Sequence, residues 1–312
     1  MTEATDLAER ESRGNPLPID AVEFQAKAPS DVRLPPRSGL IFVLVALSGS
    51  AVLCIRNHAV FTTPIREQGD DAANSILINQ AIHFHLLVGN YSREGFNHPG
   101  PAFLYLMSFG QDVFFSWLHV VPAQLNGQLI AVFLLNNAIL ALAALVIARH
   151  SGSWPAAVLS VAVIVLLTGG TLSWTAAWFP DLYAAPFLLA TVAGVSVAVG
   201  AHRDLPIFAF AAALLIHGHV AFIGIMGIYT VLIAIAWLAL HRPLSGYRAQ
   251  LRVARRSLIV SGAILFLFAL PIGVNLIVNW PGQFGLYWHY LHANSQQHRH
   301  SLGQVTSYLE QF

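Results

Sequence analysis

Long apolar runs alternate with short polar breaks along most of the chain. The runs cover approximately residues 39–55, 127–148, 155–173, 182–200, 205–219, 220–240 and 257–278. A helix needs about 20 mainly apolar residues to cross a bilayer, and most of the runs approach that length. Breaks that contain Arg, Gly or Pro separate most of them, and a turn near His217-Gly218-His219 divides the stretch 205–240. The pattern predicts an all-α polytopic membrane protein with about seven transmembrane helices.

Charged residues are too few to cover a soluble protein of this length. The 312-residue chain is 56% hydrophobic and 10% charged, whereas an ordinary soluble domain is about 25% charged. Of its 16 basic and 15 acidic residues, 12 lie within residues 1–38. We therefore expect residues 1–38 to be a disordered tail and residues 39–312 to form the membrane domain. The composition excludes soluble enzymes and nucleic-acid-binding proteins, and the single cysteine, Cys54, excludes an intrachain disulfide.

The segment 99–121 decides the topology, because it is apolar enough to span but contains Asp112 near its centre. An Asp at the centre of a span costs about 2.5–3.5 kcal/mol on insertion scales. Suppose that the tail is cytoplasmic. If the segment does not span, 12 Lys and Arg residues lie inside and 4 outside. If it spans, 6 lie inside and 10 outside. Cytoplasmic loops favour Lys and Arg, and the loop 241–256 alone holds five arginines. We therefore predict a multi-pass cell-membrane protein with a cytoplasmic N-terminus and an extracytoplasmic loop over residues 56–126.

Two surface helices are expected in this outer loop. Residues 72–88 repeat apolar residues at four-residue spacing up to Leu86, which is typical of an amphipathic helix that lies on membrane lipids. Asp71 stands at the N-cap position, and Gly89 follows the last expected helical residue. Pro99-Gly100-Pro101 then begins a second helix, since proline is favoured in the first turn.

The adjacent carboxylates Asp70 and Asp71 suggest general-base chemistry. A partly desolvated carboxyl group with a like-charged neighbour has a raised proton affinity, so it can deprotonate an acceptor hydroxyl. The pair can instead hold a divalent cation together with lipid phosphate oxygens. A simpler interpretation is that Asp71 only caps the helix and complements its dipole. The sequence leaves these interpretations open.

The order of motifs around the outer loop is distinctive. An acidic pair after the first span is followed by the surface helix, a Gly-Asn-Tyr stretch and His98-Pro99-Gly100-Pro101 before an aromatic helix. This order resembles the C-type glycosyltransferase superfamily, and it is similar to the protein O-mannosyltransferases and the bacterial lipid A aminoarabinose transferases. In those families the first outer loop has an acidic motif and, later, a His-Pro-Pro-like motif. The resemblance covers approximately residues 39–200 as an arrangement.

The resemblance implies transfer of a sugar from a polyprenyl-phosphate donor to a hydroxyl group outside the cytoplasm, with or without a metal ion. One of the paired aspartates would be the base, and His98 would help to shape the donor site. Three features depart from the family pattern: Gly100 replaces the second proline, Gln124-Leu125-Asn126-Gly127 holds no basic residue before the second span, and the chain ends at Phe312 where many members continue. The resemblance therefore implies a truncated or split member, with a protein partner that supplies the missing C-terminal region.

Further polar residues are candidates for binding. Arg66 and Arg93 lie near the acidic pair in sequence and suit charge-assisted bonds to a phosphate, although interfacial arginines also bind lipid headgroups. Asp181 is either a second acidic group of the same cavity or a helix cap. Histidines two residues apart do not share a helix face, so the pair around Gly218 is a chelate only if the helix breaks there. The outer histidines are candidates for metal binding or for interfacial hydrogen bonds: His289, His292, His298 and His300.

Two other functions remain open. A transporter or flippase needs ionisable residues at mid-span, whereas the Asp, Glu, Lys and Arg residues of this chain cluster near the ends of the apolar runs or in the outer loop. A non-catalytic fragment or assembly partner of a glycosyltransferase is the second alternative. Abundant Ala and Arg with a single Lys is typical of a bacterium with a GC-rich genome. We expect the acceptor to be a glycan, lipid or protein of the cell envelope.

Overall fold

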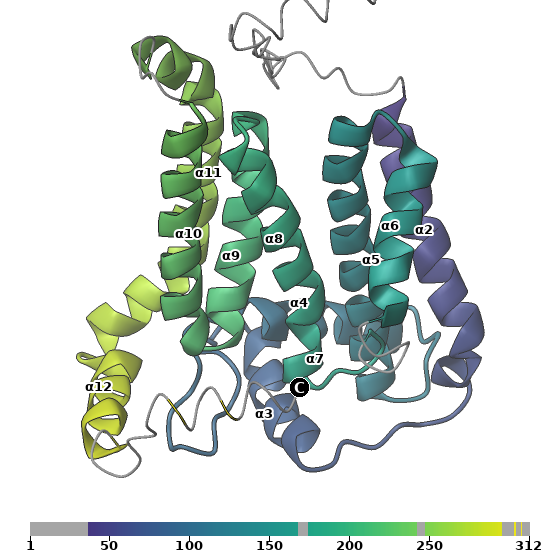
Figure 1. Cartoon of the computed structure of the whole chain (residues 1–312). Helices are drawn as coiled ribbons and strands as arrows, with labels where there is room; N and C mark the ends of the chain where they lie inside the picture. The colour runs from purple at the N-terminus through teal and green to yellow at the C-terminus, as the bar shows by residue number, and fades with distance from the viewer. Residues whose placement is uncertain (1–36, 168–173, 242–246, 295–302, 304–306, 308–312) are drawn as a thin grey trace, which may run out of the picture. The chain divides into compact units, whose positions relative to one another are not determined.

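The computed structural model describes residues 37–167, 174–241, 247–294, 303 and 307 (Figure 1). Of these described residues, 78% are helical, and they form no strand beyond an isolated antiparallel bridge between Tyr91 and Asn97. The all-α prediction is therefore confirmed. Residues 1–36 of the predicted tail lie outside the described residues.

The apolar runs fold into a series of helices. They are α2 (Ser38–Arg56), α5 (Gln124–Ser151), α6 (Trp154–Leu167), α7 (Phe179–Leu182), α8 (Ala184–Ala198), α9 (Leu205–Gly218), α10 (Ala221–Leu240) and α11 (Tyr247–Val278). Within the described residues, five stretches are long and apolar enough to cross a membrane: α2, α5, α7 together with α8, α10, and Ala254–Val278 of α11. α6 and α9 have 14 residues each, fewer than the roughly 20 that a span needs. The structure thus supports a multi-pass membrane protein with five candidate spans.

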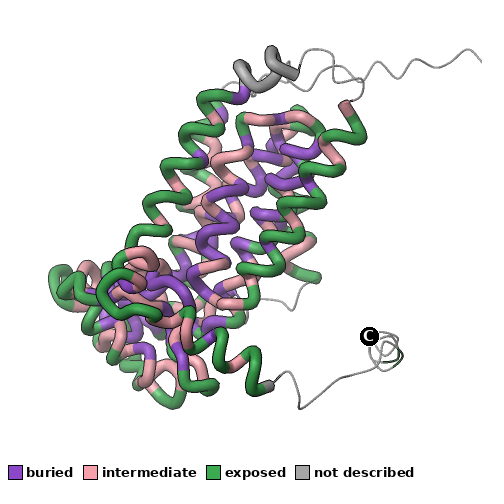
Figure 2. Tube along the Cα trace, turned by 90° about the vertical axis from the view of Figure 1, so that its left-hand side faces the viewer, coloured by how far each residue is buried: buried purple, intermediate pink, exposed green. Residues whose placement is uncertain are grey.

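The candidate spans differ in how far the rest of the protein covers them. In the apolar window of α5, and in that of α7 with α8, 56% of residues are buried, against 11% in α2, 11% in α10 and 6% in α11. Figure 2 shows the buried residues along the inner helices and the exposed ones along the outer helices. Most of the large exposed side chains on α2, α10 and α11 are Leu, Ile, Val and Phe. Water disfavours such an apolar surface and lipid accepts it, so the outer helices are suited to a bilayer.

The connections between helices gather at two ends of the helical bundle. We call one of them the loop end, and it contains residues 57–123, 174–183, 219–220 and 279–294 (Figure 1). Asn126, at the start of α5, donates to the backbone oxygens of Val60 at 2.7 Å and Thr63 at 2.9 Å. The chain therefore returns to the end at which α2 finishes. At the opposite end, the Trp154 indole donates to Ser38 Oγ at 3.3 Å.

The ambiguous segment 99–121 folds at the loop end and is not one of the candidate spans. It forms α4 (Ala102–Gly110) and a π-helix (Gln111–Trp117). α4 is an interior helix, contrary to the expected surface helix, because Phe103 and Leu104 are at most 2% exposed and pack into the main hydrophobic core. Gln111 accepts a hydrogen bond of 2.9 Å from Gln128 of α5. The segment is thus packed against α5 through both apolar and polar contacts.

The helix α3 (Asp70–Ile82) is shorter than the helix expected over 72–88. It begins after Gly69, which is the N-cap residue and has a positive φ of 55°, and both aspartates lie in its first turn without a side-chain capping bond. The prediction that Asp71 is the N-cap is therefore wrong. At the other end, Phe84 has a φ of 57° and stops the helix. Leu86 is still buried, but it reaches the core from the irregular segment that follows the turn at residues 83–84.

A buried ion pair joins three helices at the opposite end of the bundle. Arg149, in the last turn of α5, donates to Asp204, which directly precedes α9 and whose side chain is 0% exposed. Ser196 of α8 donates to the second carboxylate oxygen of Asp204 at 2.6 Å, and His150 Nε2 lies 2.7 Å from the same hydroxyl. A charge that lost its partner here would be strongly unfavourable.

Candidate functional site

The acidic pair lies where three separate segments of the loop end meet. Asp70 Oδ1 accepts a bond from Arg93 Nη2 at 3.4 Å, and Asp70 Oδ2 accepts one from the Trp178 indole at 3.4 Å. The side chains of Arg93 and Asp70 are 83% and 44% exposed. An exposed ion pair contributes only about 0.2–1 kcal/mol to folding. This cluster is therefore held by the surrounding chain, and its charges remain accessible to a ligand.

Asp71 differs from its neighbour in its surroundings. Burial raises the pKa of the Asp71 carboxyl above its ordinary value, and the negative charges of Asp70 and Glu67 raise it further. Asp71 thus has the raised proton affinity that a general base requires.

The loop 89–98 positions Arg93 at its tip and His98 at its base. Gly89 donates its backbone N–H to His98 O at 2.8 Å, and His98 donates its own to Asn90 O at 3.0 Å. Gly89 has no room for a side chain, since a Cβ atom there would lie 2.7 Å from Gly100 O and 3.0 Å from His217 O. The loop is therefore closed by short backbone contacts.

Gly100 of the His-Pro-Gly-Pro motif packs directly against His217. Its backbone N–H donates to His217 O at 3.3 Å, and a proline at this position would lack that N–H. The His217 ring is fixed in turn, because Nδ1 accepts from Ala102 N at 3.3 Å and Nε2 donates to Phe268 O at 2.8 Å. Glycine stands at position 100 instead of a second proline because His217 of α9 packs against this position and accepts its backbone N–H.

Replacing Gly100 with alanine is expected to destabilise the fold. The added Cβ would overlap the His217 imidazole, and overpacking of this kind costs about 1–3 kcal/mol. The measurement is the thermal unfolding midpoint in detergent micelles. Gly227→Ala is the matched control, because a Cβ there meets no atom within 4 Å. A Gly100→Ala protein that melts with the control would contradict this packing.

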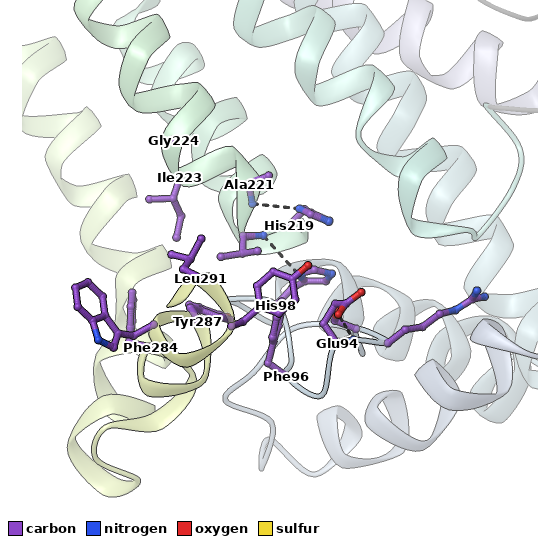
Figure 3. Close-up of a pocket in the computed structure, with 15 residues that line it drawn as sticks. Glu94, Phe96, His98, His219, Ala221, Ile223, Gly224, Phe284, Tyr287 and Leu291 are labelled. Carbon is purple, nitrogen blue, oxygen red and sulfur yellow. Dashed lines mark hydrogen bonds between the residues drawn. The ribbon is translucent and has the colours of Figure 1, made fainter. Parts of the chain in front are cut away.

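A cavity of about 890 Å³ lies beside the loop 89–98 (Figure 3). Its walls come from this loop, from the start of α10 and from α12 (Gly282–Asn294): Ser92, Arg93, Glu94, Phe96, His98, His219, Val220, Ala221, Ile223, Gly224, Phe284, Tyr287, Trp288, Tyr290 and Leu291. Most of these side chains are apolar or aromatic. Arg93 and Glu94 add one charge of each sign. The cavity therefore suits a ligand with a long apolar part and a polar end.

Hydrogen bonds and ring contacts attach α12 to the loop 89–98. Tyr287 donates its hydroxyl to Asn97 O at 2.6 Å, and Asn97 N donates to Gln283 Oε1 at 2.8 Å. Phe96 lies edge-on to Tyr287 and Tyr290, with ring centroids 5.0 and 5.4 Å away. The wall formed by α12 is thus fixed to the same loop that contains Arg93 and His98.

His98 and His219 form a second polar feature of the cavity wall. Their ring centroids are 4.2 Å apart. Burial and the neighbouring His219 lower the pKa of His98 to about 4, and burial lowers the pKa of His219. Both imidazoles are therefore neutral at physiological pH.

The structure brings some of the predicted site residues together and separates others. Arg93 contacts Asp70 and also lines the cavity. Asp181 lies in the first turn of α7, where its backbone N–H bonds to Trp178 O at 3.0 Å, so Trp178 connects it to Asp70. Arg66 is exposed on the segment that precedes α3. His98 lies in the cavity wall, in a separate part of the loop end from the paired carboxylates.

The histidine pairs do not form chelates in the described part of the chain. The predicted break at Gly218 is confirmed, since α9 ends there and α10 begins at Ala221. The two rings have different neighbours: His217 contacts Phe268, while His219 contacts His98. Among the described residues, no group of three or more His, Cys, Asp or Glu side chains is arranged to hold a metal ion. His298 and His300 lie outside the described residues.

Sequence reasoning missed the contribution of three residues to the loop end. Trp178 bonds to Asp70 across 108 positions, His219 lies beside His98, and Tyr287 fastens α12 to the loop. The break at Gly218 was the one sequence feature that pointed to any of them, because it exposes His219 at the start of α10.

Comparison of the chain with protein-family models, with curated proteins and with solved structures gives no match. The assignment of function therefore rests on the site itself.

Proposed function

We propose that this protein transfers a sugar from a polyprenyl-phosphate donor to a hydroxyl group outside the cytoplasm. The observation that supports it is the double contact of Arg93, which pairs with Asp70 and also lines the apolar cavity of about 890 Å³. The acidic pair, the Arg93 guanidinium and the apolar cavity lie at one end of the helical bundle. Together they suit a substrate that has a sugar, a phosphate and a lipid chain. Arginine is well suited to phosphate because its planar fork donates several hydrogen bonds.

The proposed reaction is a single displacement at the anomeric carbon. The acceptor oxygen attacks this carbon and forms the new glycosidic bond, while the bond to the phosphate oxygen breaks with its electron pair. The lipid phosphate leaves as an anion, and the acceptor proton passes to a carboxylate. Asp71 is the better base of the pair, because its pKa is raised, whereas Asp70 is engaged by Arg93 and Trp178.

The other predicted residues take supporting roles in this proposal. Arg93 binds the donor phosphate, and the exposed Arg66 adds positive charge near the same end. Asp181 lies in the turn that follows Trp178, and we assign it to the acceptor. His98 shapes the donor cavity. A divalent cation that bridges the acidic pair and the phosphate is an optional addition, which a chelator would reveal.

The proposal includes an orientation with the loop end outside the cytoplasm. The arginine-rich segment 241–256, which includes the start of α11, favours a cytoplasmic position for the opposite end. A lipid-linked donor is required outside because nucleotide sugars are made inside. Transport is less well supported. In the described candidate spans, Asp, Glu, Lys and Arg lie close to the helix ends, at Arg56, Arg149, Asp181, Arg255 and Arg256, rather than at mid-span as an ion path requires.

The test is a turnover assay with the purified full-length chain in proteoliposomes. A panel of radiolabelled polyprenyl-phosphate sugars is supplied with envelope extracts as acceptors, with and without a chelator. We expect transfer of label from at least one donor to an acceptor. Absence of transfer with every donor would contradict the proposal and favour an assembly partner that lacks catalysis of its own.

A further inference from the structure

The two histidines of the cavity wall are oriented by the start of α10. His98 Nδ1 accepts the backbone N–H of Val220 at 3.4 Å, and His219 Nδ1 accepts that of Ala221 at 3.1 Å (Figure 3). A backbone N–H is always a donor, so both Nδ1 atoms act as acceptors. A neutral imidazole has one N–H and one acceptor nitrogen. The proton of each ring is therefore on Nε2.

Both residues line the cavity, so each is a ring beside it that has one N–H donor and adds no net charge. The two rings lie 4.2 Å apart between centroids, with their planes tilted by 32°. A proton added to either ring would place a positive charge against its neighbour and against buried apolar side chains. His98 is only 5% exposed, and its backbone is fixed on both sides by bonds to Gly89 and Asn90. The donors are thus preorganised, which lowers the cost of binding an acceptor.

The rest of the cavity lining supplies an apolar wall for the remainder of a ligand. Ile223 and Gly224 belong to a candidate span, and Phe284, Trp288 and Leu291 come from α12. Glu94 contributes a carboxylate that Arg93 balances in charge. Recognition of an anion here would therefore depend on directed donors, the two imidazoles together with Arg93, more than on the net charge of the lining.

We propose that His98 and His219 form a two-donor subsite that binds the phosphate of an amphipathic lipid, with the lipid chain on the apolar wall of the cavity. The inference rests on the proposed function for the class of lipid, a polyprenyl phosphate, and adds a specific pair of residues that recognise its phosphate. A lipid phosphate and a free phosphate offer the same group to these donors, and the probes below distinguish the two ligands.

The test measures binding to the purified full-length chain in detergent micelles by the change in tryptophan fluorescence. The probes are farnesyl phosphate, farnesol and inorganic phosphate. We expect the wild-type chain to bind farnesyl phosphate at least about tenfold more tightly than farnesol, because hydrogen bonds to a charged group are among the stronger ones. Inorganic phosphate should bind much more weakly than farnesyl phosphate, since it has no chain to bury.

Two substitutions at His219 separate phosphate binding from a structural role. His219→Asn keeps an oxygen near the position of Nδ1, so it retains the bond to Ala221 N and loses the Nε2 donor. His219→Gln keeps a donor near the position of Nε2 and loses the Nδ1 acceptor. We expect His219→Asn to lose about tenfold in preference for farnesyl phosphate over farnesol, and His219→Gln to retain most of it. His98→Asn and His98→Gln are expected to repeat this order, which makes the result independent of a folding defect in one variant.

Several outcomes would overturn the subsite. These are equal wild-type affinity for farnesyl phosphate and farnesol, inorganic phosphate binding as tightly as farnesyl phosphate, or His219→Asn keeping the wild-type preference. The opposite order, with asparagine tolerated and glutamine damaging, would show that the histidine only caps α10. The subsite and the proposed function can fail separately. If the expected binding pattern is found but no sugar donor is turned over, the subsite stands and the transferase function is contradicted. If a donor is turned over but binding does not depend on the histidines, the transferase function stands and the subsite is contradicted.

Discussion

Replacing Asp71 with asparagine is expected to lower turnover of the lipid-linked sugar by about 100- to 10 000-fold, the range that a general base contributes. Asparagine has nearly the same shape and cannot accept the acceptor proton. Asp70→Asn should have a smaller effect, because Asp70 positions Arg93 through its ion pair. The measurement is kcat for the best donor found in the turnover assay.

The control for this prediction is a carboxylate elsewhere at the loop end. Asp112→Asn changes a residue of the π-helix Gln111–Trp117 and should leave turnover close to the wild-type value.

The raised pKa of Asp71 also predicts how turnover depends on pH. The base is inactive when protonated, so kcat/KM should fall on acidification through a pKa above 3.8, the ordinary value of the carboxyl group. Full turnover by the Asp71→Asn protein would eliminate the base assignment.

Replacing Asp204 with asparagine is expected to lower the free energy of unfolding by about 3–5 kcal/mol, because it leaves the Arg149 charge without its partner in a buried position. Asp204 is 0% exposed and Arg149 is 13% exposed. The measurement is the unfolding transition in detergent under increasing denaturant. Arg56→Gln, at the exposed end of α2, should change the free energy by less than about 0.5 kcal/mol.

A double substitution tests the cause of this loss. Arg149→Met combined with Asp204→Leu removes both charges and fills the space with apolar side chains, so it should recover most of the stability. If the double variant is as unstable as Asp204→Asn, the buried charge is not the cause, and the bond from Ser196 to Asp204 becomes the better explanation.

The helical class and the approximate positions of the apolar helices followed from the sequence because lipid imposes a simple rule. Each crossing needs a long apolar run, and charged residues are kept at its ends. The same rule correctly kept 99–121, with Asp112, out of the candidate spans. Its burial could not be foreseen, because the contact of Gln111 with Gln128 depends on how α5 passes beside it.

The detailed form of residues 56–126 was less predictable from local patterns. The apolar spacing up to Leu86 suggested a continuous helix, but spacing records only which residues are buried. A turn with Phe84 at positive φ buries Leu86 equally well. Similarly, an aspartate before an apolar stretch is a common helix cap, yet here Gly69 takes the N-cap position and both aspartates lie inside the first turn.

The site itself depends on contacts between residues that are far apart in the sequence. The sequence made Asp70 a candidate only because it is next to Asp71. The structure shows that Arg93 and Trp178 donate hydrogen bonds to it. His98 was a candidate through a motif, and the structure adds His219 from the start of α10. No periodicity within one helix identifies such partners, because the folding of the whole loop end brings them together.

The central claim is that the acidic pair works outside the cytoplasm, and labelling of introduced cysteines tests it most directly. In a Cys54→Ala background, Gln68→Cys puts a thiol at an exposed position beside the acidic pair, and Ser151→Cys puts one at the exposed end of α5 on the opposite side. In intact cells, a membrane-impermeant maleimide should modify position 68 at once and position 151 only after permeabilisation. Modification of position 151 alone in intact cells would contradict the claim.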